Sequence, residues 1–134
     1  MTVFVDTSAL YALLDRDDAN HGRAAEAWRN LLTREENLVT NNYVLLETLA
    51  LLQNRLGIVA VHAFQEDVKP MLAVDWVTEE QHRTGVEAVL AAGRKKLSVV
   101  DCVAFQSMRE SGVRSVFCFD QHFREQGFHL IPTG

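Results

Sequence analysis

Short apolar runs alternate with longer amphipathic stretches along the whole chain. Runs of apolar, β-branched and aromatic residues predict strands, whereas apolar residues that recur at helical spacing predict helices. The predicted strands are residues 2–5, 38–40, 73–77, 115–119 and 129–131. The predicted helices are residues 9–14, 19–34, 43–56, 58–71, 79–96 and 98–110. Strands that alternate with helices in this way predict the α/β class, as a three-layer α/β/α sandwich with a central parallel sheet.

The composition is that of a globular chain. Of its 134 residues, 48% are hydrophobic, and only 7 are Gly and 2 are Pro. A chain of this length and composition buries a core of its own and is typical of one domain. We therefore expect residues 1–134 to form a single domain.

The apolar runs are too short or too polar for a membrane span or a secretory signal. Asp6 interrupts the apolar start of the chain, and Glu47 and Arg55 interrupt the longest apolar stretch. Cys102 and Cys118 lack the spacing of a metal-binding pair, so we expect two buried, reduced thiols. These features predict a soluble cytoplasmic protein with no membrane partner.

Four carboxylates occupy places where a charge is costly. Asp6 and Asp120 each end a predicted strand, Asp101 lies near the start of a helix, and Glu47 interrupts an apolar helix. In a parallel sheet such positions converge on the edge formed by the carboxyl ends of the strands. Four converging acids repel one another unless cations lie between them. An all-oxygen set without a Cys/His cluster favours Mg²⁺ or Mn²⁺.

Each acid also has a purely structural explanation. Asp6 and Asp120 suit turns, and Ser98 with Asp101 three positions later fits a capping box. Glu47 is the hardest to explain in this way, because an apolar helix face gains nothing from a carboxylate. The four acids together favour a metal site over four separate structural roles.

The segments around these acids resemble the four motifs of the PIN domain, in order and at the usual spacing. They are VFVDTSAL at 3–10, TNNYVLLE at 40–47, LSVVDC at 97–102 and FDQHF at 119–123. The resemblance spans nearly the whole chain. It is closest to the small bacterial and archaeal members that include the VapC-type toxins.

This resemblance implies a metal-dependent endoribonuclease that hydrolyses RNA phosphodiester bonds. Asp6, Glu47, Asp101 and Asp120 match the family's catalytic, metal-holding acids for one or two Mg²⁺ or Mn²⁺ ions. Thr7 and Asn41 match the supporting hydroxyl or amide of many members.

The resemblance also implies the toxin of a type II toxin–antitoxin pair, with RNA as substrate, a separate antitoxin chain and a homodimer. The apolar helical region 43–71 is the expected dimer interface. An RNA-processing nuclease outside a toxin–antitoxin system remains an alternative.

Other residues are candidates for contributing to the site or to the core. Arg94, Lys95 and Lys96 are candidates for contacting RNA phosphates, although a basic run also suits a helix C-terminus. His122 is the one histidine expected near the acids, in a surface role. Both Trp residues and the seven Phe residues are expected in the core.

Two rival enzyme or signalling classes fit less well. A haloacid dehalogenase-type phosphatase requires a second Asp two positions after the first, where this chain has Ser8. A receiver-like module requires adjacent acids and a late Lys, which the segment 117–119 lacks. A PIN-like interaction module without activity would lack some of the acids. A Mg²⁺-dependent phosphatase or receiver-like module therefore stays a secondary hypothesis.

The net charge of −5 first argues against a nucleic-acid partner. Removing the four proposed site acids from the 18 acidic residues leaves 14 against 13 basic ones. Most of the acidic excess is therefore the proposed metal site, and bound divalent ions would neutralise it.

Overall fold

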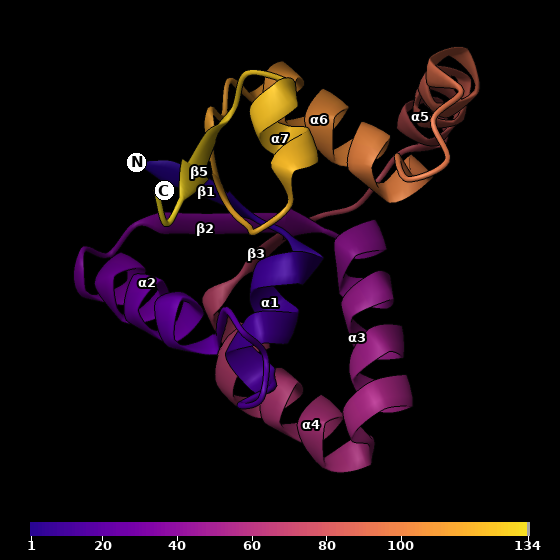
Figure 1. Ribbon diagram of the computed structural model, residues 1–134. Coiled ribbons are helices and arrows are strands. Elements are labelled where there is room, and N and C mark those ends of the chain that lie inside the picture. The colour runs from indigo at the N-terminus through magenta and orange to yellow at the C-terminus, as the bar shows by residue number, and fades with distance from the viewer. Residues whose placement is uncertain (134) are drawn as a thin grey trace.

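The computed structural model describes residues 1–133 as a parallel sheet between two layers of helices (Figure 1). The five strands are β1 (Thr2–Val5), β2 (Asn37–Asn41), β3 (Ala73–Asp75), β4 (Ser115–Phe117) and β5 (His129–Ile131). They are ordered β3-β2-β1-β4-β5, and every pair is parallel. The predicted α/β/α sandwich with a central parallel sheet is confirmed.

The helices divide between the two faces of the sheet. One layer contains α1 (Thr7–Leu14), α2 (His21–Thr33), α3 (Asn42–Leu56) and α4 (Ile58–Ala63). The other contains α5 (Glu79–Ala92), α6 (Val99–Ser111) and α7 (Gln121–Glu125), with α5 on the outer side of α6 (Figure 1). Parallel strands need such crossover helices, which is why the sheet is covered on both faces.

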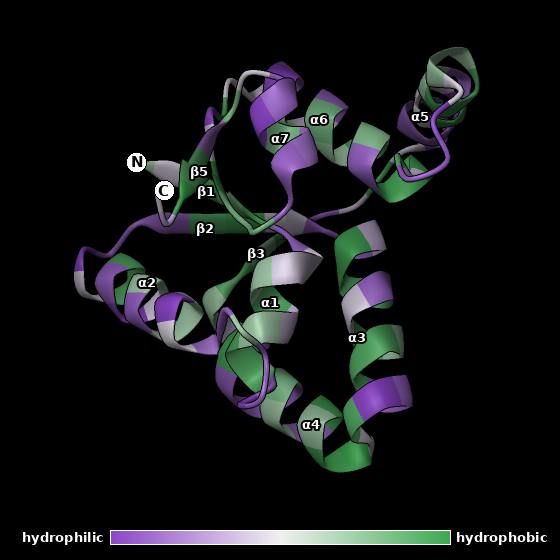
Figure 2. Cartoon of the chain, in the orientation of Figure 1, coloured by the Kyte–Doolittle hydropathy of each residue, from purple (hydrophilic) through white to green (hydrophobic). Residues whose placement is uncertain are grey.

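The core follows from the two-sided burial of the central strands. Val3, Phe4 and Val5 of β1 are all buried, and β4 is buried throughout. Figure 2 shows the central strands as largely hydrophobic, whereas α2 carries many hydrophilic residues. Trp28 of α2 stacks on Phe117 of β4 with ring centroids 6.3 Å apart. All seven Phe residues lie in or against this core, as predicted.

Of two further predictions about the core, one is confirmed and the other is wrong. Cys102 and Cys118 are buried free thiols, as expected. Trp76 was predicted to lie in the core, but it is 74% exposed. Its position explains the difference, because β3 is a short edge strand that ends at Asp75 and leaves Trp76 in the following loop.

Several predicted helix and strand ends differ from the structure. The helix predicted over residues 79–96 ends at Ala92, because Gly93 adopts a left-handed conformation with φ of 62°. Arg94, Lys95 and Lys96 therefore lie in the loop before α6 and not on a helix C-terminus.

The segment 58–71, predicted as one helix, consists of three consecutive helical segments of different type. After α4 it continues as the π-helix η1 (Phe64–Val68) and the 3₁₀-helix η2 (Lys69–Met71). Pro70 lies in the first turn of η2, where its missing N–H is not needed for a helical hydrogen bond. The predicted strand 115–119 ends earlier, at Phe117.

Helix α5 is attached to the rest of the protein through a close contact with α6. Gly85 is its one buried residue, and a Cβ built there would lie 2.4 Å from Cγ2 of Val103. The absence of a side chain at Gly85 thus allows the two helices to approach each other.

Within residues 1–133, none of the helices combines the length and apolar character needed to cross a membrane.

Candidate active site

Three of the four predicted acids lie at the N-terminal ends of helices. Asp6 is the N-cap of α1, Asp120 is the N-cap of α7, and Asp101 lies in the first turn of α6. Asp6 follows the carboxyl end of β1 directly. Asp120 follows β4 by a short loop. Unpaired backbone N–H groups at helix N-termini favour negative side chains, so the local fold itself accommodates these charges.

Asp6 is fixed in place by its neighbour Ser8. The carboxylate is 4% exposed, and its Oδ2 accepts hydrogen bonds from the backbone N of Ser8 at 3.1 Å and from Ser8 Oγ at 2.8 Å. Ser8 Oγ also accepts a hydrogen bond from the backbone N of Phe119 at 2.9 Å. Ser8 thereby connects the β1–α1 junction to the loop that leads to Asp120.

Asp101 forms a complete capping box with Ser98. Its Oδ2 accepts from the backbone N of Ser98 at 3.1 Å, and its own N donates to Ser98 Oγ at 3.1 Å. Asp101 is only 9% exposed. The box therefore orients a carboxylate that is largely removed from solvent.

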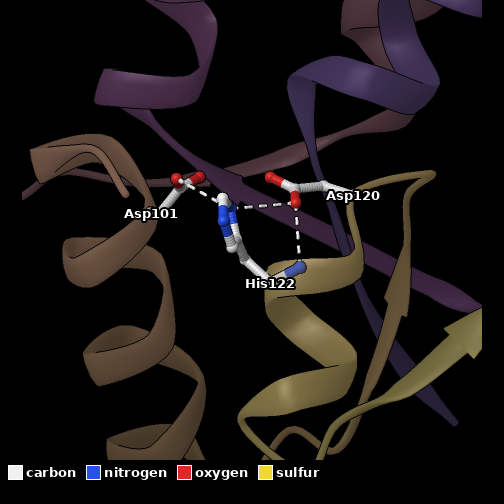
Figure 3. A group of neighbouring side chains, drawn as sticks. All are labelled: Asp101, Asp120 and His122. Atoms are coloured by element: carbon white, nitrogen blue, oxygen red, sulfur yellow. Dashed lines mark hydrogen bonds and ion pairs between the residues drawn. The ribbon is translucent and has the colours of Figure 1, made fainter. Parts of the chain in front are cut away.

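Asp120 and His122 meet Asp101 from the other side of the site. The backbone N of His122 donates to Asp120 Oδ1 at 2.9 Å, which caps α7. The ring of His122 lies between the two carboxylates, with Nδ1 at 3.1 Å from Asp120 Oδ1 and 3.8 Å from Asp101 Oδ2 (Figure 3). One donor atom from each of the three residues lies within 4.8 Å of the others.

Glu47 reaches the same region from α3. It is more exposed than the three aspartates, and its charge interacts with those of Asp101 and Asp120. Burial raises the pKa of Glu47, and the nearby Thr7 hydroxyl opposes this rise. Thr7 also accepts from Thr48 Oγ1 at 3.1 Å, so it joins the start of α1 to α3.

Asn41 is buried at the junction of β2 and α3. Its Oδ1 accepts from the backbone N of Val44 at 2.9 Å and caps α3. Its Nδ2 has no hydrogen-bond partner among the described residues. The structure thus explains Asn41 as a helix cap that positions the helix carrying Glu47.

The pKa values of the acids reflect burial beside like charges. Burial, opposed by the hydrogen bonds from Ser8 and reinforced by the charges of Asp101 and Asp120, raises the pKa of Asp6 to about 7. Burial also raises the pKa of Glu47 and of Asp101, with further contributions from neighbouring acids. The carboxylates therefore repel one another while they are charged.

The donor set fits a divalent cation. Carboxylate oxygens are suitable ligands for hard divalent ions, and an imidazole nitrogen is added at His122. Burial is the main cause of the raised pKa of Asp6, Glu47 and Asp101, and the charges of neighbouring acids add to it. A cation would relieve the part that comes from repulsion between the acids. The capping hydrogen bonds that the sequence suggested for the aspartates are present, and they are compatible with metal binding by the same carboxylates.

The basic run is less closely connected with the acids. Arg94 forms an ion pair with Glu125, with Nη1 and Oε2 2.9 Å apart. Lys95 and Lys96 are exposed in the turn before Ser98. Contact between these residues and RNA stays a prediction.

The sequence-based view of the site missed two contributors. His122 was expected in a surface role, which is wrong, because its Nδ1 is buried between two acids. Ser8 entered the sequence analysis only as the residue that stands where a phosphatase has its second Asp. A signal for both exists in the sequence, since each follows an acid by two positions and a turn at that acid directs the side chain back toward it.

Comparison with known proteins gives the family. Residues 3–129 match the model of the PIN domain, and the chain belongs to this family. It is 33% identical over 127 residues to the 23S rRNA-specific endonuclease VapC20 of Mycobacterium tuberculosis, in two strains, covering 94% of this chain and 95% of the relative.

Solved structures show the same fold. The chain matches the crystal structure of M. tuberculosis VapC20, described as a sarcin-ricin loop cleaving toxin, with a TM-score of 0.82 and 33% identity over 94% of this chain and 95% of that one. FitAcB from Neisseria gonorrhoeae matches with a TM-score of 0.68 at 13% identity, covering 97% and 96%. PAE2754 from Pyrobaculum aerophilum matches with a TM-score of 0.62 at 21% identity, covering 98% and 90%.

These findings confirm the prediction of a PIN-domain endoribonuclease, a hydrolase of the VapC toxin type. Nucleases of this family use divalent metal ions, in agreement with the carboxylate cluster.

Proposed function

We propose that this chain cleaves 23S rRNA at the sarcin-ricin loop with the help of Mg²⁺ or Mn²⁺. The convergence of Asp101, Asp120 and His122 beside the buried Asp6 is the observation that carries the proposal. The choice of target is supported by the 33% identity to VapC20, which covers nearly all of both chains.

In this proposal each residue of the site has its own role. Asp6, Asp101 and Asp120 would hold the cation, and Glu47 of α3 would complete the set. Ser8 and Ser98 orient the carboxylates of Asp6 and Asp101 through their hydrogen bonds. When bound, a divalent ion neutralises charge on the phosphoryl group and lowers the pKa of a water molecule. Thr7 joins α1 to the helix that carries Glu47, and Asn41 caps the start of that helix.

The phosphate backbone of RNA requires positive charge outside the metal site. Lys95 and Lys96 stand exposed in the loop that leads to the Asp101 helix, and Arg94 is tied to α7 through Glu125. We propose that this loop contacts RNA phosphates.

We further propose that the protein acts in the cytoplasm as a homodimer that is inhibited by a separate antitoxin. Large apolar side chains are exposed where α3 meets α4, including Ile58 and Val59, which is 82% exposed. Such a group of apolar residues marks an interaction surface. Light scattering should show a dimer that Val59→Asp converts to a monomer, whereas the exposed Leu90→Asp on α5 should leave it intact. A wild-type monomer would contradict this assembly.

Incubation of the purified protein with ribosomes and with isolated 23S rRNA tests the activity. Primer extension should map one cut in the sarcin-ricin loop in the presence of Mg²⁺ or Mn²⁺, and no cut with EDTA. Asp6→Asn should abolish the cut, and Lys69→Gln, on η2, serves as a control outside the proposed site.

Equal cleavage by wild type and Asp6→Asn, or cleavage unaffected by EDTA, would contradict the metal-carboxylate mechanism. Metal-dependent cleavage of another RNA, with the sarcin-ricin loop left intact, would support the ribonuclease activity. It would contradict the proposal that the sarcin-ricin loop is the target.

A further inference from the structure

His122 has a buried nitrogen that the local fold does not use. The side chain belongs to α7, and its Nδ1 is shielded from solvent. Although Nδ1 lies 3.1 Å from Asp120 Oδ1, no well-directed hydrogen bond joins Nδ1 to a partner among residues 1–133. A buried polar atom without a hydrogen bond is costly, and a bound ion is one partner that would remove this cost.

Capping of α7 does not require the imidazole. Asp120 Oδ1 accepts the backbone N–H of His122 at 2.9 Å, and any residue except proline supplies that donor. The ring is therefore available for a role that its own helix does not need.

The position of the ring points to that role. Figure 3 shows the imidazole between Asp101 of α6 and Asp120, which precedes α7. The three donor atoms lie within 4.8 Å of one another. Opposite ligands of an ion held at roughly 2.0–2.1 Å are about 4 Å apart, so a small side-chain adjustment brings all three donors onto one ion.

We propose that His122 is a direct nitrogen ligand of the metal ion, so that the site is a mixed nitrogen and oxygen site that prefers Mn²⁺ to Mg²⁺. Imidazole nitrogen contributes more to the binding of first-row transition ions than to that of Mg²⁺, which prefers oxygen and retains water. The inference rests on the proposed metal-dependent function, but it concerns metal binding and not RNA cleavage.

Pulsed electron paramagnetic resonance of Mn²⁺ bound to the full chain, without RNA, tests the ligand directly. Wild-type protein should show electron spin echo modulation from a coordinated ¹⁴N nucleus. Protein labelled with ¹⁵N-histidine should show the ¹⁵N pattern in its place, a result that needs no variant. His122→Gln should lose the modulation, whereas His129→Gln, at an exposed histidine of β5, should keep it.

Measured affinities for Mn²⁺ and Mg²⁺ show whether His122 binds the ion itself or only positions another residue. His122→Gln should weaken Mn²⁺ binding by about tenfold or more and change Mg²⁺ binding much less. An equal loss for both ions would indicate a role through Asp120 and overturn the proposal, as would Mn²⁺ bound without nitrogen modulation, or no Mn²⁺ binding.

The two proposals fail in different ways. Nitrogen modulation without RNA cleavage would support His122 as a ligand and reject the ribonuclease function. Mn²⁺-dependent cleavage without nitrogen modulation would reject the ligand alone.

Discussion

The N-terminal ends of α5 and α6 carry the same local motif in two different surroundings. In α5, Thr78 and Gln81 form a capping box with hydrogen bonds of 3.0 and 3.1 Å. In α6, Ser98 and Asp101 form the same box with two hydrogen bonds of 3.1 Å. A neutral amide and a carboxylate thus perform the same capping task in neighbouring helices.

The difference between the two boxes lies in burial and charge. The α5 box is exposed, and its third-position side chain is uncharged. The Asp101 carboxylate is buried beside other acids, and its pKa is raised by burial and by the charge of Asp120. Because Gln81 shows that a cap needs no charge, the charge at Asp101 requires another explanation, and metal binding supplies one.

The largest expected effect comes from removing the charge at Asp101 while keeping the cap. Asp101→Asn retains an oxygen that accepts the Ser98 N–H, so folding stability should be unchanged or higher as repulsion falls. Cleavage should fall by about 10³-fold, because loss of a proposed metal ligand would remove several kcal/mol of transition-state stabilisation. Single-turnover RNA cleavage and urea unfolding measure the two effects.

Gln81→Glu in the α5 box is the matched control. It introduces a charge at the exposed cap and should leave cleavage within about twofold, because surface substitutions away from a site have small effects. A large loss of cleavage in Gln81→Glu, or full cleavage by Asp101→Asn, would contradict the claim that only the α6 capping box contributes to activity.

The next effect is the pH dependence of stability without metal. The pKa of Asp6 is about 7 in the folded protein, against an ordinary value of 3.8. The folded state therefore holds the Asp6 proton more tightly than the unfolded state. The contribution of Asp6 to stability is fully present below pH 4 and is lost as the pH rises through 7, by at most about 4 kcal/mol.

Asp6→Asn should flatten this slope, and a divalent ion should restore stability at high pH by favouring the charged acids. Urea unfolding of EDTA-treated protein from pH 4 to 8 measures the slope. Stability that increases across this range in the wild type, with the same slope in Asp6→Asn, would show that Asp6 does not have a raised pKa.

A smaller effect is expected where α5 packs on α6. Gly85→Ala places a methyl group 2.4 Å from Cγ2 of Val103, so the helices must separate. We expect a loss of about 1–3 kcal/mol from overpacking, reduced by up to ~1 kcal/mol through better helix propensity. Thermal unfolding by circular dichroism measures the change.

Gly22→Ala provides the comparison, because a Cβ at Gly22 of α2 meets no atom within 4 Å. It should stabilise the protein slightly. Equal behaviour of the two variants would mean that α5 does not approach α6 through Gly85.

The smallest effects should come from the capping hydroxyls. Thr78→Ala and Ser98→Ala should each cost about 1 kcal/mol of stability, because each removes one cap. Only Ser98→Ala should also lower cleavage, by about 10- to 100-fold, since Ser98 orients a proposed metal ligand. Equal cleavage by the two variants would argue that the α6 box is structural alone.

Periodicity predicted the layers and the parallel sheet because apolar β-branched runs and amphipathic helices alternate clearly. Helix and strand ends were less predictable, as at Gly93, where a left-handed residue stops α5 although the basic residues after it suit a helix end. Trp76 was placed wrongly because residue type gives no indication that β3 is a short edge strand.

The acids of the site were recognisable because each interrupts or ends an apolar run. His122 was not, because its role depends on a tertiary arrangement in which α7 turns its ring toward Asp101 of another helix. The same limit applied to Ser8, whose bond to Phe119 joins residues far apart in sequence.

Calorimetric titration of Mn²⁺ into wild type, Asp101→Asn and Gln81→Glu tests the central claim that this edge of the sheet holds a divalent ion. Wild type and Gln81→Glu should bind with the same affinity, and Asp101→Asn should bind at least tenfold more weakly. Equal binding by Asp101→Asn, or no binding by the wild type, would contradict the account.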